Sequence, residues 1–255
     1  MFTIIISILA GLGAGLGTGL AGMSAASVVS PMLITFVGIN AYEAIGIALF
    51  SDVLASAVSA YTYSKNKNID IKNGLTMMTS VLVFTMIGSY LSSLVDVNIM
   101  GGLSVFSTLF MGLKFLIMPV KTTKSEMQAL SAKKRFIQSI MGGIVIGLIC
   151  GFVGAGGGIM MLMILTIVLG YELKTAIGTS VFIMSFTAFT GAVSHFYIGG
   201  FPDMTCLIVC SISTLVFAQL AATFANKISS KLLNLSMGII LTILGMILVI
   251  FNYLL

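Results

Sequence analysis

Charged side chains are too scarce in this sequence for a protein that is surrounded by water. Twelve Lys or Arg and seven Asp or Glu are the only charged residues among 255, and 58% of the residues are hydrophobic. A soluble domain usually carries about 25% charged residues, which it needs to cover its surface. Intrinsic disorder is excluded for the opposite reason, because it requires few apolar residues. We therefore expect an integral membrane protein.

The apolar residues fall into ten segments. A membrane-spanning helix takes about 20 residues, and two of the segments, 24–37 and 159–169, are too short to span the membrane comfortably and follow Gly-rich breaks. The expected fold is an all-α polytopic membrane protein with eight to ten membrane segments. The run from Phe2 lacks the basic region and the cleavage site of a signal peptide, so we expect a retained helix. The segments cover residues 2–21, 24–37, 42–63, 74–95, 98–118, 137–153, 159–169, 175–197, 204–225 and 232–254.

The distribution of charge predicts how these segments are oriented. If each segment takes the chain to the other side of the membrane, one side receives only Glu43, Asp96 and Asp203. All basic residues fall on the opposite side, namely Lys65, Lys67, Lys72, Lys114, Lys121, Lys124, Lys133, Lys134, Arg135, Lys174, Lys227 and Lys231. Lys and Arg are enriched in cytoplasmic loops. We therefore predict that the basic side is cytoplasmic, that both termini are outside, and that the net charge of +5 does not indicate nucleic-acid binding.

The sequence also matches itself at an offset of 132 residues. The triplet Ala44-Ile45-Gly46 recurs as Ala176-Ile177-Gly178. Four glycines recur in register: Gly11, Gly15, Gly19 and Gly22 match Gly143, Gly147, Gly151 and Gly154. Each copy holds five segments, and because five is odd, the second copy starts from the other side of the membrane. We predict an inverted repeat, with a first repeat at 1–118, a basic cytoplasmic linker at 119–136 and a second repeat at 137–255.

The Gly-rich breaks are the predicted substrate site. Residues 151–158 read GFVGAGGG and residues 19–26 read GLAGMSAA, and each Gly disfavours a helix by about 1 kcal/mol relative to Ala. We expect 2–37 and 137–169 to be broken or re-entrant helix pairs, because irregular backbone is tolerated at membrane depth only inside protein or a water-filled cavity. The second arm of each pair offers free N–H groups and a positive dipole end to an anion. The candidate substrate-binding residues are Gly22, Ser24, Ser27, Gly154, Gly156, Gly157, Gly158, Thr179 and Ser180.

A simpler interpretation competes with substrate binding at some of these positions. For the glycines at four-residue spacing within 2–21 and 137–153, close helix packing is favoured. The hydroxyls of Thr179 and Ser180 could instead bond back to their own helix.

Asp52 and His195 are the candidate ion-coupling residues. Asp52 lies in the middle of segment 42–63, where a charged carboxylate costs at least about 2.5 kcal/mol. We hypothesise that it lines the pathway and carries a coupling proton or cation. The alternative is a protonated, structural Asp bonded to a neighbouring helix. His195 is the only His and lies near the external end of its segment, where it is either a proton relay or a bystander.

The residues for several other chemistries are missing. The sequence has no Gly-x-x-x-x-Gly-Lys-[Ser/Thr] loop and no Gly-x-Ser-x-Gly motif, which hydrolysis of ATP or of esters commonly uses. Cys150, Cys206 and Cys210 lie in apolar segments without further ligands for a metal. We expect no enzymatic activity, no cofactor and no metal.

The chain resembles the sulfite exporter TauE/SafE family, also described as 4-toluene sulfonate uptake permeases. The likeness rests on residues 151–158, on Ala176-Ile177-Gly178-Thr179-Ser180, on Ser30-Pro31 with the triplet at 44–46, and on the polar turns at 68–70 and 200–203. It implies a carrier for small anions, often sulfur-containing oxyanions or organosulfonates, that is driven by an ion gradient. The family often repeats its Gly-Gly-Gly pattern in the first half, where this chain has Ser24-Ala25-Ala26.

The leading hypothesis is a secondary transporter of small anions in the cell membrane. Its partners would be an anionic substrate, the lipid bilayer and a coupling proton or cation, and a homo-oligomer is left open. The alternatives are an anion channel or facilitator of the same fold and a membrane redox or assembly factor that uses its cysteines.

Overall fold

All regular structure in the described residues is helical, as predicted. The computed structural model describes residues 1–92, 106, 109–128, 131–153 and 157–253. Five helices are long and apolar enough to cross a membrane. The predicted candidates Gly154 and Gly156, together with Asp96, lie outside the described residues.

The helices follow the predicted segments closely. They are α1 (Phe2–Ala21), α2 (Ala26–Met32), α3 (Ala41–Lys65), α4 (Ile71–Ser92), α6 (Lys124–Gln128), α7 (Ala132–Val153), α8 (Gly157–Met163), α9 (Leu173–Gly199), α10 (Met204–Lys227) and α11 (Ser230–Tyr253). Residues 109–117 are also helical. The short helix α6 and the first turn of α7 lie within 119–136, which was predicted only as a linker.

The chain breaks its helix in the first half where the small residues predict a break. Helix α1 ends at Ala21, and Gly22 adopts a left-handed conformation with φ 62°. This conformation strains any residue with a Cβ, so glycine suits the position. Helix α2 begins at Ala26 and continues into a π-helical turn at Leu33–Val37. In the second half, α7 ends at Val153 and α8 begins at Gly157.

Several element boundaries repeat at or within one residue of the sequence offset. Helix α3 begins at Ala41 and α9 at Leu173, which are 132 residues apart. A π-helical turn also follows α8, at Ile164–Val168. The N-caps correspond as well, because the side chains of Asn40 and Glu172 each accept a hydrogen bond from the backbone N–H three residues later.

Glycine seams join helices from the two halves of the chain. Helix α1 packs against α10, and α7 packs against α4. A Cβ added at Gly15 would lie 2.7 Å from the Thr214 carbonyl oxygen, and one at Gly147 would lie 2.7 Å from the Val81 carbonyl oxygen. Only glycine lets the backbones approach this closely. The packing interpretation of the regularly spaced glycines is confirmed.

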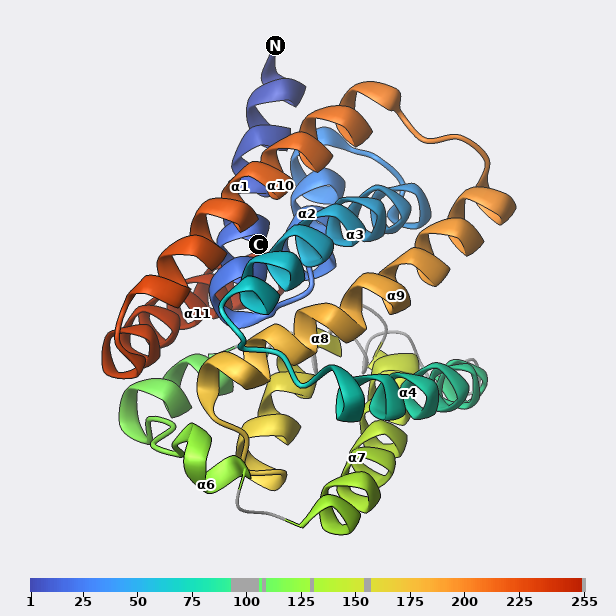
Figure 1. The fold of residues 1–255 in the computed structure, drawn as a ribbon. Helices are drawn as coiled ribbons and strands as arrows, with labels where there is room; N and C mark the ends of the chain where they lie inside the picture. Colours follow the sequence, from blue (N-terminus) through green and yellow to red (C-terminus); the bar gives the residue numbers. More distant parts are fainter. Residues whose placement is uncertain (93–105, 107–108, 129–130, 154–156, 254–255) are drawn as a thin grey trace.

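Helices α3 and α9 form the centre of the molecule. They pack against each other, α3 also contacts α10, and α9 also contacts α4 (Figure 1). The outer helices turn apolar side chains outward. On α10 the exposed side chains recur every four residues, at Ile208, Ile212, Val216, Leu220 and Phe224. A helix that exposes its apolar face in this way fits a lipid environment.

The basic loops gather at one end of the bundle. Lys124 Nζ donates to the carbonyl oxygen of Lys67, and Lys174 Nζ donates to that of Ile228 at 2.6 Å. Arg135 and the Asp70 carboxylate lie 3.9 Å apart. These contacts link loops that the charge pattern assigns to the same side of the membrane.

Candidate functional site

The start of α8 meets the break between α1 and α2. Gly158, in the first turn of α8, packs against the Gly22 carbonyl group, and a Cβ added there would lie 2.7 Å from the backbone nitrogen of Ser24. Gly158 and Ser24 are both buried. The contact is therefore made by main chain on both sides, which explains why glycine is needed at position 158.

Helix α9 also packs against Gly22 and Gly158. The space next to Gly22 is filled by Ser180 Oγ, and a Cβ on Gly158 would lie 2.5 Å from Met184 Sδ. The hydroxyl of Ser180 donates to the Ile177 carbonyl oxygen at 2.8 Å, so it bonds back to its own helix. The sequence brought Gly22, Ser24, Gly158 and Ser180 forward as separate candidates, and the structure brings them together.

Asp52 is tied to the first break by hydrogen bonds. Its side chain is 1% exposed. Ser24 Oγ donates to Oδ2 at 2.6 Å, and Ser56 Oγ donates to Oδ1 at 2.9 Å. The carboxyl group thus lies beside the start of α2, where the positive end of the helix dipole favours a negative charge, and the Ser24 hydroxyl that it binds also accepts from the Ala26 N–H at 3.3 Å.

Ser56 and Met184 were missed as site residues by the sequence analysis. Ser56 lies one turn after Asp52 on α3, and this i to i+4 spacing was a signal available in the sequence. Met184 had no such signal, because its part in the site follows from how α8 meets α9.

The remaining candidates lie around this centre in different ways. Ser27 is buried in α2, and Gly157 is half-buried at the start of α8. Thr179 is buried as well, but its hydroxyl oxygen accepts a hydrogen bond at 3.1 Å from the backbone N–H of Asp70. Thr179 therefore faces the turn between α3 and α4, whereas its neighbour Ser180 faces the breaks.

Asp70 fastens that turn to the second half of the chain. Its carboxylate accepts a hydrogen bond from the Tyr171 hydroxyl at 3.2 Å, in addition to its ion pair with Arg135. Burial, and then the neighbouring Asp70 charge, raise the pKa of Tyr171 above its usual range. Tyr171 therefore stays protonated and remains a donor.

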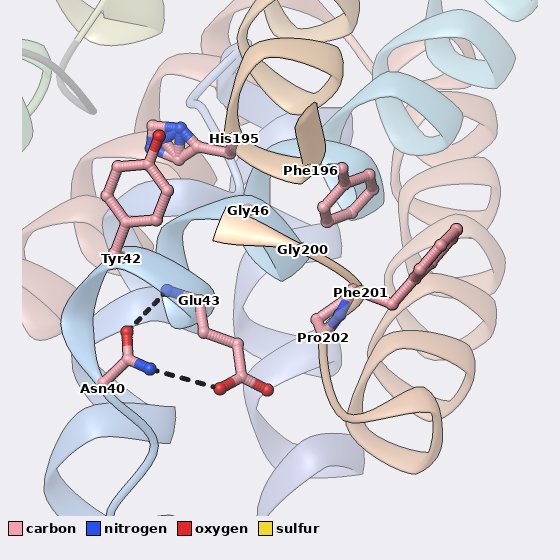
Figure 2. Close-up of a pocket in the computed structure, with 9 residues that line it drawn as sticks. All are labelled: Asn40, Tyr42, Glu43, Gly46, His195, Phe196, Gly200, Phe201 and Pro202. Carbon is pink, nitrogen blue, oxygen red and sulfur yellow. Dashed lines mark hydrogen bonds between the residues drawn. The ribbon is translucent and has the colours of Figure 1, made fainter. Parts of the chain in front are cut away.

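His195 lies apart from Asp52, in a cavity beside the first turns of α3. The cavity has a volume of about 250 Å³ and lies between the start of α3 and the end of α9 with the following residues (Figure 2). The ring of His195 stacks on Tyr42 with centroids 4.3 Å apart. Its Nδ1 atom is buried and has no hydrogen-bond partner among the described residues. Glu43 lines the same cavity and accepts a hydrogen bond from the backbone N–H of Asp203 at 2.6 Å.

The two described cysteines are engaged in packing on one face of α10. Cys206 and Cys210 are buried free thiols. Cys206 Sγ accepts a hydrogen bond from Ser7 Oγ at 3.8 Å, and Cys210 Sγ donates to the Ser7 carbonyl oxygen at 3.6 Å. In the described part of the chain, no three His, Cys, Asp or Glu side chains gather as a metal site would require.

The comparison with known proteins identifies the family. The model of the sulfite exporter TauE/SafE family matches residues 7–248. The chain belongs to this family. The resemblance inferred from the sequence motifs is thereby confirmed, and residues 19–26 and 151–158, which carry part of it, are the segments that contain the two breaks.

Several curated relatives are named as transporters. The probable membrane transporter protein YunE of Bacillus subtilis (strain 168) is 26% identical over an alignment of 266 positions, gaps included. The alignment covers 94% of this chain and 95% of YunE. The probable membrane transporter protein MJ0441 of Methanocaldococcus jannaschii is 27% identical. The alignment covers 80% of this chain and 77% of MJ0441. YdhB of Bacillus subtilis (strain 168), with the same description, is 22% identical over 89% of this chain and 92% of its own length. A membrane transporter, and not an enzyme, is the function that these likenesses support.

Proposed function

We propose that the chain is a secondary transporter of small anions that binds its substrate where the start of α8 meets the break between α1 and α2. Sulfur-containing oxyanions or organosulfonates are the proposed substrate class, in line with the description of the family. The observation that carries the proposal is the contact of Gly158 with Gly22 and Ser24 beside a buried carboxyl group.

The binding chemistry of this proposal is that of main chain and hydroxyl groups. The described residues of the site include glycines, serines and one acid, but no Lys or Arg. An anion would therefore be held by N–H groups at the starts of α2 and α8 and by serine hydroxyls. Both helices continue into a π-helical turn. Sites at broken helices near the midplane are common in transporters with inverted repeats.

Asp52 couples a proton to the substrate in this mechanism. Its carboxylate takes up the hydroxyl of Ser24 beside the start of the α2 arm. A second anion at the same donors would be repelled, because two negative charges at one buried site are strongly unfavourable. Proton binding at Asp52 removes this charge and frees donors for the substrate, so the proton and the anion move together.

His195 is proposed to serve the external end of the same ion path. Gly46, which touches His195, lies six residues before Asp52 on α3, or about 9 Å along the helix axis. The cavity with Glu43 and His195 would give protons access from that side. This arrangement assigns the two ion-coupling candidates to separate steps.

The proposal includes an inverted repeat with a cytoplasmic basic end. It is supported by the matching starts of α3 and α9 and by the reciprocal pairing of α1 with α10 and α7 with α4. The pairs α1 with α2 and α7 with α8 would then be two re-entrant hairpins, one from each side. The contacts that Lys124, Lys174 and Arg135 make with neighbouring loops support the placement of the basic loops on one side of the membrane.

Counterflow in sealed vesicles tests the transport mechanism. Purified protein is reconstituted into liposomes loaded in turn with unlabelled sulfite, sulfate, thiosulfate or toluenesulfonate, and uptake of the same anion in labelled form is followed. A carrier gives uptake that is stimulated by its substrate on the inner side. Flux without this stimulation would mean a channel or facilitator, and absence of flux with every anion in the panel would contradict the proposed substrate class.

The coupling role of Asp52 is tested with Asp52→Asn. We expect this variant to retain sulfite exchange while losing the accumulation driven by an imposed proton gradient, because the amide cannot bind the proton. His195→Gln serves as the comparison and should slow gradient-driven uptake without abolishing it. Normal accumulation by Asp52→Asn, with an unchanged pH dependence, would contradict coupling at this residue.

A further inference from the structure

A basic cavity of about 610 Å³ lies at the end of the bundle where the basic loops gather. It is formed by the segment 119–124, the start of α11 and the turn after α3. Asn234 of α11 holds one wall, because its side chain accepts from the Val120 N–H at 2.8 Å and donates to the Val120 carbonyl oxygen at 3.1 Å. Asn234 is 3% exposed. The wall is therefore fixed by buried hydrogen bonds.

Three lysines and one acid line this cavity. Lys124 is engaged with the turn after α3, where it donates to Asn68 Oδ1 at 3.2 Å. Among the described residues, Lys121 and Lys231 have neither a hydrogen-bond nor an ion-pair partner. The acid, Glu172, is occupied, because its carboxylate accepts from Thr175 N–H at 2.9 Å and from the Thr175 hydroxyl at 2.8 Å. The cavity thus carries an excess of positive charge with two free ammonium groups.

An apolar groove of about 310 Å³ adjoins the basic cavity. The two share Pro119, Lys231 and Asn234. The groove continues between the helix at 109–117 and α11, along Leu116, Leu232 and Leu235. These three leucines are 39%, 44% and 49% exposed, so an apolar ligand can reach them.

We infer that this composite surface binds one anionic phospholipid. The headgroup phosphate lies in the basic cavity against Lys121 and Lys231, and an acyl chain lies in the groove along α11. A free phosphate or the transported anion would use the lysines but not the leucines. The continuity of the basic cavity with the apolar groove, at the end of helices that cross the membrane, selects the lipid. The site is separate from the breaks where the transported anion is proposed to bind.

Native mass spectrometry of the purified, delipidated protein tests this inference. Phosphatidylglycerol and phosphatidylcholine of equal chain length are titrated separately, with glycerol 3-phosphate and inorganic phosphate as soluble arms. We expect one tightly bound phosphatidylglycerol and much weaker binding of the other three. Equal binding of both lipids, or binding of the soluble phosphates as tight as that of the lipid, would overturn the inference.

Two variants locate the site. The double variant Lys121→Gln/Lys231→Gln should weaken phosphatidylglycerol binding about thirtyfold, as expected for two lysines near a membrane surface. Lys133→Gln is the matched control, because Lys133 is exposed on the first turn of α7 and does not line the cavity. Leu235→Gln should weaken the lipid but leave glycerol 3-phosphate unchanged. Equal losses in the double variant and in Lys133→Gln would contradict the assigned location, and circular dichroism of each variant checks that the helices are intact.

Discussion

At the scale of single residues, the buried carboxyl group of Asp52 is the most informative feature. An acid in the middle of a membrane segment needs donors, and Ser24 and Ser56 supply them at 2.6 and 2.9 Å. The position of Asp52 and its cost were predictable from the sequence, since one acid interrupts an apolar run. Ser24 as its partner was not, because the sequence does not say which face of α3 meets the first break. The structure joins two residues that were predicted for different roles.

The charge state of Asp52 determines what Ser24→Ala does to stability. A hydrogen bond to a charged group contributes about 1.5–3 kcal/mol, against about 1 kcal/mol for a neutral pair. We therefore expect Ser24→Ala to lower the free energy of unfolding more than Ser51→Ala. Each substitution removes one hydrogen bond with a backbone group, to Ala26 N–H for Ser24 and to the Ile47 carbonyl oxygen for Ser51, but the second contact of Ser51, with the Ser211 hydroxyl at 3.2 Å, is neutral. Unfolding of both variants in detergent micelles gives the comparison. Equal losses would indicate that Asp52 is a neutral, structural acid.

At the scale of the elements, the helices were predictable and their contacts were only partly so. Hydropathy located α1, α3, α9, α10 and α11 to within a few residues, because long apolar runs have few alternatives in a membrane. The π-helical turns at Leu33–Val37 and Ile164–Val168 were not predicted, because no simple residue pattern distinguishes them from an ordinary last turn. The glycine spacing predicted close packing, but not that α1 would find its partner in α10.

The glycine seam of α1 gives a prediction at this scale. A Cβ added at Gly15 would lie 2.7 Å from Phe217 Cβ and 2.8 Å from the Ala218 backbone nitrogen. Gly15→Ala should therefore force α1 and α10 apart, at a cost of about 1–3 kcal/mol.

Gly13→Ala is the matched control on the same helix. The nearest atom to its new Cβ is a methyl carbon of Val28 at 3.2 Å, with Leu244 at 3.9 Å. This variant should be neutral or gain up to about 1 kcal/mol, because Ala favours a helix over Gly. Thermal unfolding of the two variants in the same detergent tests both expectations. A stable Gly15→Ala protein would contradict the tight seam.

At the scale of the whole molecule, charge separates the two ends of the bundle. The loops with Lys67, Lys124, Arg135 and Lys174 are linked to one another, whereas Glu43 and the backbone of Asp203 meet elsewhere. Counting segments predicts that these loops share one side of the membrane, and which side each end faces stays a prediction. The sequence analysis did not predict that each end would also carry a cavity, since each cavity joins helix ends to loops whose paths depend on helix packing.

Cysteine labelling tests which end faces the cytoplasm. In a protein whose own three cysteines are replaced by Ala, Phe201→Cys and Ser125→Cys each introduce one thiol at an exposed position. A membrane-impermeant maleimide should label Phe201→Cys in intact cells and Ser125→Cys only after lysis, because basic loops stay inside. Lysed cells provide the control for reactivity at both positions. The reverse pattern would mean that both termini are cytoplasmic.

The pairing of α1 with α10 also has a consequence for biosynthesis. Helix α1 is made first, but the helix that covers its glycine face is complete only when translation has passed Lys227. Until then the face of α1 with Gly11 and Gly15 must be covered by lipid or by an insertion factor. A nascent chain released before α10 would leave this face open, so truncated products should be preferred substrates of membrane proteases. The second seam forms earlier, since α4 needs only α7.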